Sequence, residues 1–108
     1  MDYTDRRRSP RHLFFASAEI TDSNPEFSVQ AHTSELARHG CFMDMMNPFL
    51  DGTPLTVCIT HGGQLVEAAA RVVHSRPNVG MGIAFDRVDM AQERILEEWI
   101  SDLQNPGA

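Results

Sequence analysis

The residues best suited to bind a ligand are four arginines near the start of the chain, Arg6, Arg7, Arg8 and Arg11. The protein contains no lysine, so arginine supplies all nine of its Lys and Arg residues. A guanidinium group is a planar fork of donors that holds phosphate or carboxylate with two hydrogen bonds, which an ammonium group cannot do. The arginines therefore predict an anion-binding segment, and a solvated basic tail is the alternative that they leave open.

The spacing of Arg7 and Arg11 favours a single shared ligand. Pro10 biases the residue before it towards an extended conformation. In an extended chain Arg7 and Arg11 point to the same side, about 13 Å apart at roughly 3.3 Å per residue. A ligand with two phosphate groups could contact both guanidinium groups.

Charge is distributed unevenly between the two ends of the sequence. The first eleven residues carry four arginines against two acids, whereas the other 97 carry five arginines against thirteen acids. These 97 residues carry a net negative charge and would repel a nucleic-acid backbone, because binding DNA or RNA requires many phosphates to be neutralised together. We therefore expect a small anionic ligand, and neither DNA nor RNA.

Alternating apolar residues predict six β-strands separated by turn-forming residues. The strands are expected at His12–Asp22, Phe27–Leu36, Cys41–Met45, Pro54–Thr60, Leu65–His74 and Val79–Phe85. The alternation stops within residues 34–40, where a bend is expected, and Gly40 there indicates a positive φ or a close neighbour. Strands of this length and spacing are typical of an antiparallel barrel or sandwich.

A single amphipathic helix is expected at residues 90–104, with Asp89 as its N-cap. Its apolar residues recur at helical spacing: Ile95, Leu96, Trp99, Ile100 and Leu103. Trp99 either closes one end of the strand assembly or faces a partner, and the apolar residues around it favour closure. The chain thus divides into a flexible arginine-rich arm, residues 1–11, and one domain, residues 12–104.

The cysteines, histidines and nucleophilic side chains are interpreted as structural or surface residues. Cys41 and Cys58 lack Cys-x-x-Cys spacing and are expected to be reduced core residues. The histidines and cysteines do not show the paired spacing of a metal site, and no nucleophile has a recognisable base partner. We therefore expect no metal, no cofactor and no catalysis. A helix needs about 20 consecutive apolar residues to span a bilayer, and no apolar run in this sequence is nearly that long. We therefore expect a cytoplasmic protein without membrane insertion.

Two further groups leave alternatives open. Five residues between positions 42 and 49 serve either as adaptable core filler or as a soft interaction surface, and we favour the core. They are Phe42, Met43, Met45, Met46 and Phe49. Gly80 and Gly82 lie within a predicted strand, which favours close packing or close approach of a ligand over a dinucleotide loop.

The whole pattern resembles the PilZ domain family over essentially the entire chain. The resemblance is carried by the Arg-x-x-x-Arg spacing of Arg7 and Arg11, by Gly40, and by the strand Val79–Phe85 followed by a helix. It implies an all-β fold, a six-stranded antiparallel barrel with one C-terminal α-helix. It also implies a receptor for the bacterial second messenger cyclic di-GMP that changes the surface offered to a protein partner.

In this family the arginines hold the ligand's phosphates and guanines, and the resemblance assigns that role to Arg7 and Arg11, with Arg6 as a third candidate. A second family motif, Asp/Asn-x-Ser-x-x-Gly, contacts the ligand from the barrel surface. Here Gly40 matches this motif, but Glu35 replaces Asp/Asn and Ala37 replaces Ser.

These two replacements leave the function open between two classes. Losing the serine hydroxyl is expected to weaken binding by about tenfold at most. Glu35 either accepts hydrogen bonds from a guanine edge or turns back and neutralises Arg11. The arginines favour a cyclic di-GMP receptor, whereas Glu35 and Ala37 favour a PilZ-like protein-interaction domain that has lost nucleotide binding.

Overall fold

The computed structural model describes residues 10–22 and 27–105. Within these ranges the strands are β1 (His12–Leu13), β2 (Ser17–Thr21), β3 (Ser28–Ala37), β4 (Gly40–Asp44), β5 (Pro54–His61), β6 (Gln64–Arg76) and β7 (Gly80–Val88). The helix α1 (Met90–Gln104) follows. Most of the predicted arm and of the turn at residues 22–25 lies outside the described residues.

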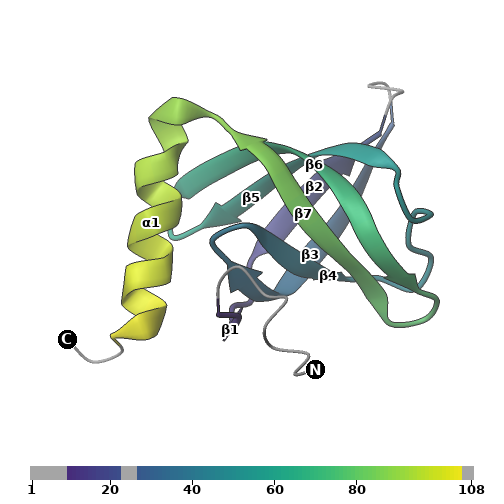
Figure 1. The fold of residues 1–108 in the computed structure, drawn as a ribbon, viewed down its shortest axis with the longest axis horizontal. Coiled ribbons are helices and arrows are strands. Elements are labelled where there is room, and N and C mark those ends of the chain that lie inside the picture. The colour runs from purple at the N-terminus through teal and green to yellow at the C-terminus, as the bar shows by residue number, and fades with distance from the viewer. Residues whose placement is uncertain (1–9, 23–26, 106–108) are drawn as a thin grey trace, which may run out of the picture.

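The strands form one antiparallel sheet that closes on itself (Figure 1). Their order is β1-β3-β2-β5-β6-β7-β4, and β4 also pairs with β3. β1 and β2 both pair with β3, β1 at residues 35–36 and β2 at residues 28–32, so they act as two segments of one strand. The predicted six-stranded antiparallel barrel with one C-terminal helix is confirmed.

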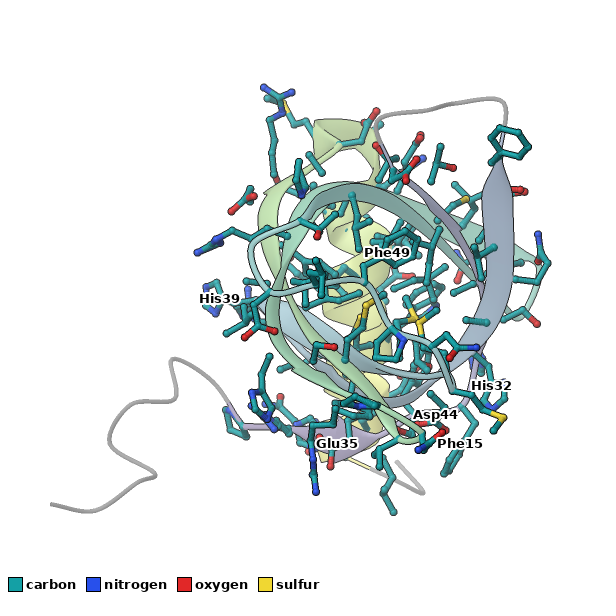
Figure 2. The ribbon with its side chains drawn as sticks, turned by 90° about the vertical axis from the view of Figure 1, so that its right-hand side faces the viewer. Phe15, His32, Glu35, His39, Asp44 and Phe49 are labelled. Atoms are coloured by element: carbon teal, nitrogen blue, oxygen red, sulfur yellow. The ribbon has the colours of Figure 1, made fainter. Side chains whose placement is uncertain are left out.

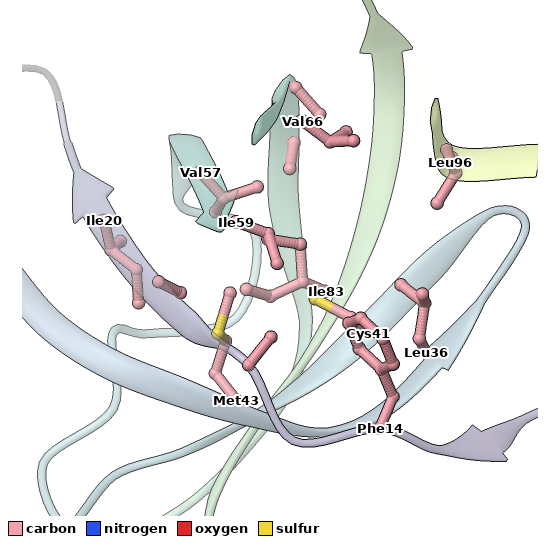
Figure 3. Close-up of a cluster of buried hydrophobic side chains, with 14 of the residues drawn as sticks. Phe14, Ile20, Leu36, Cys41, Met43, Val57, Ile59, Val66, Ile83 and Leu96 are labelled. Atoms are coloured by element: carbon pink, nitrogen blue, oxygen red, sulfur yellow. The ribbon is translucent and has the colours of Figure 1, made fainter. Parts of the chain in front are cut away.

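The barrel interior is filled by the alternate residues that each strand turns inward (Figure 3). The largest fully buried side chains are Ile20, Leu36, Met43, Ile59, Met81, Val57, Val66, Val72 and Thr33. Thr33 is the polar member of this set, and its hydroxyl group is hydrogen-bonded. The interior is therefore a packed apolar core, and ligand chemistry has to be sought on the outer surface.

Helix α1 packs against one end of the barrel through Leu96, Trp99 and Ile100, which are buried. The Trp99 ring centroid lies 5.3 Å from that of Phe14 and 5.7 Å from that of His61. This packing confirms that Trp99 closes an end of the barrel. Among the described residues, no helix combines the length and apolar character that crossing a membrane requires.

The junction between β7 and α1 explains where the helix begins. The Asp89 carboxylate accepts a hydrogen bond of 2.8 Å from the backbone N–H of Ala91, as expected of an N-cap. Beyond the end of β7, the backbone N–H of Glu67 in β6 donates to the side-chain oxygen of Gln92. The first turn of α1 thus supplies a hydrogen-bond acceptor to β6 at a position that β7 no longer reaches.

The expectation that both cysteines lie in the core is wrong for Cys58. Cys41 is buried, and burial raises the pKa of its thiol to about 12. Cys58 faces outward between Glu19 and Glu67, its strand neighbours. Partial burial first, and then those two carboxylates, raise the pKa of the Cys58 thiol.

The methionine and phenylalanine group belongs mainly to the core, as favoured. Met43 is fully buried, and Met45 and Phe49 pack against the core. Figure 2 shows Phe49 over the barrel interior, at the end away from α1. Met46 and Phe42 are the exceptions, because Met46 is exposed and the half-buried Phe42 does not belong to the core cluster.

Replacing Trp99 by alanine tests the closing role of the helix. Truncating a large buried aromatic side chain costs about 3–5 kcal/mol, so Trp99→Ala should lower the free energy of unfolding by that amount in urea denaturation. Glu98→Ala, on the exposed side of the same helix, is the control and should stay within about 0.5 kcal/mol of the parent. Equal effects of the two variants would show that the helix does not hold the barrel together.

Candidate ligand-binding site

The predicted site residues that the structure describes come from the segment just before β1, from β3 and from the start of β4. Arg11 directly precedes β1, and Glu35 in β3 is the register partner of Leu13 in β1. Figure 2 shows Glu35 on the same side of the barrel as Phe15, His32 and Asp44. We refer to this outer surface of β1, β3 and β4, with the segment that joins β1 to β2, as the binding face.

Glu35 is paired with Arg11 in this structure. The Arg11 Nη1 atom lies 3.6 Å from Glu35 Oε1, and the two side chains are 45% and 38% exposed. Of the two roles that the sequence left open for Glu35, neutralising Arg11 is the one observed. An ion pair this exposed contributes only about 0–1 kcal/mol, so a stronger anionic partner can replace it.

The Thr33 side chain fixes how the N-terminal strand meets β3. Its hydroxyl donates to the backbone oxygen of Phe14 at 2.6 Å and accepts from the backbone N–H of Ala16 at 3.1 Å. In addition, the Thr33 N–H donates to the Ala16 oxygen at 2.9 Å. The Thr33 side chain thus replaces a backbone hydrogen bond between the strands where residues 14–16 depart from regular pairing with β3.

These contacts correct the prediction of one uninterrupted strand from His12 to Asp22. The pairing of β1 with β3 and that of β2 with β3 differ in register by one residue, so residues 14–16 form an irregular segment with one extra residue. Alternation survives across it, because Phe14 and Ala16 are buried whereas Leu13 and Phe15 are exposed. Arg11 therefore shares its outward side with two apolar residues.

The bend expected within residues 34–40 takes the form of two separate features. The pairing of β3 with β4 shifts register between Thr33 and Glu35, which indicates a bulge at Ser34. Strand β3 then continues to Ala37, and a turn at residues 38–39 leads into β4. The second family motif therefore lies on a strand end and a turn.

The other two residues carried over from that motif are closely packed. Ala37 pairs with Gly40 and is only 8% exposed, so little of its side chain is accessible. A Cβ atom on Gly40 would collide with the backbone oxygen of Ile83 in β7. Close approach of a neighbouring strand therefore accounts for this glycine, as one of the sequence alternatives proposed.

A cleft of about 380 Å³, which sequence reasoning missed, lies beside the turn at residues 38–39. It separates this turn from the end of β7 and the first turns of α1, and Arg38 lies 3.3 Å from Glu97 of the helix. Its lining includes the basic side chains Arg38 and Arg87 and several acidic ones, so its charge does not single out an anion. The outward-facing Arg11 is the better candidate for an anion site.

Arg6 and Arg7 lie outside the described residues, so their contribution to the site stays a prediction. Within residues 10–22 and 27–105, no group of three or more His, Cys, Asp or Glu side chains is arranged to hold a metal ion. The site that the structure describes therefore consists of Arg11, Glu35 and their neighbours on the binding face.

A family comparison covers nearly the whole chain. The model of the PilZ domain matches residues 5–102. No curated protein sequence is significantly similar to the chain.

Several solved structures share the fold. The PilZ domain of CeSA from a cellulose-synthesizing bacterium is 19% identical, with a TM-score of 0.69 over 90% of this chain and 100% of that one. The PilZ domain of YcgR from Escherichia coli, solved with c-di-GMP, is 16% identical, with a TM-score of 0.71 over 92% of each chain. The Bacillus subtilis inhibitor of motility MotI/DgrA is also 16% identical, with a TM-score of 0.74 over 95% of this chain and 54% of that one.

Replacing Thr33 by valine tests whether its hydroxyl fixes the strand junction. Valine keeps the shape but leaves the Phe14 oxygen and the Ala16 N–H without their side-chain partner, so stability should fall by about 1–3 kcal/mol. Thr60→Val, at an exposed position of β5, is the matched control and should have little effect in the same denaturation experiment. A neutral Thr33→Val variant would mean that the junction is held by the backbone alone.

Proposed function

Since the chain belongs to the PilZ domain family, whose members are non-catalytic receptor modules, we propose that it is a receptor for cyclic di-GMP. The ligand lies on the binding face, where the N-terminal arginines hold its phosphates. Its binding changes the surface that the domain offers to a protein partner. A relative of the same fold, the YcgR domain, was solved with this ligand, which supports the choice of nucleotide.

The observation that carries the proposal is the position of Arg11. Its guanidinium group is accessible on the barrel surface and forms an exposed ion pair with Glu35. An ion pair this exposed contributes about 0–1 kcal/mol. A ligand phosphate that accepts two hydrogen bonds from the guanidinium group can therefore displace the Glu35 carboxylate.

Five further residues contribute to the proposed site. Arg7 holds the second phosphate, and Arg6 is the third candidate arginine. Once released from Arg11, the Glu35 carboxylate can accept hydrogen bonds from the donor edge of a guanine base. Ala37 and Gly40 lie where the family motif contacts the ligand, but their close packing limits them to a supporting part.

The second candidate function is a PilZ-like interaction domain without nucleotide binding. The pairing of Glu35 with Arg11 favours this function, because the Glu35 carboxylate already neutralises the guanidinium group that a phosphate would bind. Isothermal titration calorimetry with cyclic di-GMP separates the two functions. Saturable heat supports the receptor, and no heat at high ligand concentration supports the interaction domain.

Replacing Arg11 by alanine tests the central contact of the receptor. Loss of a charge-assisted phosphate contact worth about 1.5–3 kcal/mol should weaken binding roughly 10- to 150-fold in the same calorimetric titration. Arg71→Ala is the matched control, because Arg71 of β6 forms a similarly exposed ion pair with Asp86 of β7. If both variants bind as the parent does, Arg11 does not hold the phosphate.

Replacing Glu35 by glutamine tests whether this carboxylate competes with the ligand. Removing its charge frees Arg11 and relieves repulsion of the phosphates, so affinity should rise about 1.5- to 5-fold, the range expected for a surface ion pair. Asp86→Asn removes the equivalent partner of Arg71 and should leave affinity unchanged. A fall in affinity for Glu35→Gln would instead show that the hydrogen bonds from guanine to the carboxylate outweigh its competition for Arg11.

A further inference from the structure

Two large apolar side chains are exposed beside the predicted anion site. Leu13 and Phe15 are 70% and 65% exposed, although each is flanked by a buried or half-buried residue on either side. They occupy the odd positions of the N-terminal strand that follow Arg11, so all three side chains point outward. The irregular segment at residues 14–16 preserves this alternation and keeps Phe15 on the surface.

Charged and polar groups border this apolar surface. Glu35 is the register partner of Leu13 and holds Arg11. His32 lies 3.6 Å from Asp44 on the neighbouring strands, and Figure 2 shows this pair on the same side of the barrel as Phe15. Neighbouring exposed apolar side chains with a rim of polar groups are typical of a ligand or partner surface, and Leu13 and Phe15 form such a pair.

The identity of the ligand follows from the neighbours of the ring. Alternate residues of a strand lie about 6.6 Å apart, so Arg11 and Phe15 are separated by roughly 13 Å along one side of the chain. A nucleotide carries an anionic phosphate for the guanidinium group and a flat base for the aromatic ring. A partner that is purely apolar would take the Arg11–Glu35 ion pair out of water without offering it hydrogen bonds, which is costly.

We propose that Phe15, flanked by Leu13, is the surface on which one guanine base of the ligand stacks while Arg11 holds a phosphate. This inference rests on the proposed function. It adds a contact residue that belongs neither to the Arg-x-x-x-Arg motif nor to the Asp/Asn-x-Ser-x-x-Gly motif. Stacking of a base on an aromatic side chain is tolerant of base identity. Phe15 therefore contributes affinity, and hydrogen-bonding groups such as Glu35 select guanine.

Alanine replacement of two equally exposed phenylalanines provides the test. Phe15→Ala should weaken binding of cyclic di-GMP about 5- to 150-fold in calorimetry, the range expected for losing one base–aromatic stack. Phe27→Ala is the matched control, because Phe27 is 67% exposed and lies just before β3, away from Arg11 in the sequence. Phe15→Tyr keeps an aromatic ring and should retain the parent affinity, whereas Phe15→Leu should not.

The outcomes distinguish this inference from the proposed function. If the parent protein binds the nucleotide and Phe15→Ala binds equally well, the stacking role is wrong and the receptor function stands. If the parent protein does not bind, both are wrong. If Phe15→Ala leaves affinity unchanged but converts a dimer into a monomer in light scattering, the exposed ring serves contact between copies of the chain and the stacking role is overturned.

Discussion

The barrel depends on β3 being paired along both of its edges. β1 and β2 occupy one edge and β4 the other, and the contact with β4 joins the two ends of the sheet. A strand that meets two partners of different register needs irregular positions, and β3 has one beside Ser34. On the opposite edge, the Thr33 hydroxyl bridges the irregular segment at residues 14–16. Closure of the barrel and the shape of the binding face therefore have one origin.

That arrangement gives the binding face its chemical character. The strand entering the barrel turns Arg11, Leu13 and Phe15 outward, and β3 places Glu35 within 3.6 Å of the arginine. The face thus combines a cation, a competing carboxylate and exposed apolar groups. In a chain with a net charge of −6, the proposed binding at Arg11 is a competition between the protein's own Glu35 carboxylate and an external anion.

Periodicity in the sequence predicted the elements because it is a local property. The helix was placed at residues 90–104, where α1 lies, since its apolar spacing and its Asp89 cap are both short-range signals. The outward orientation of Cys58 could have been predicted as well. Its neighbours Val57 and Ile59 are the inward residues of that strand, so alternation places Cys58 on the other side.

Features that depend on contacts between distant residues could not be read in this way. The break at residues 14–16 depends on Thr33, which follows it by about 17 positions and reaches it only after the strands have paired. The ion pair between Arg11 and Glu35 likewise depends on the register of β1 against β3. The burial of Ala37 depends on how the chain packs around the end of β3. Sequence patterns predicted the elements and proposed the candidate site residues, and the tertiary contacts determined how those residues are paired.

The most direct test of the account is to map ligand binding by amide chemical shifts of the ¹⁵N-labelled protein during titration with cyclic di-GMP. The account predicts that the amides of Leu13, Phe15 and Glu35 shift saturably, while those of Val57 and Val66, on β5 and β6, keep their positions. Shifts concentrated on β5 and β6 would contradict it, because the nucleotide would then bind away from the face that β3 organises.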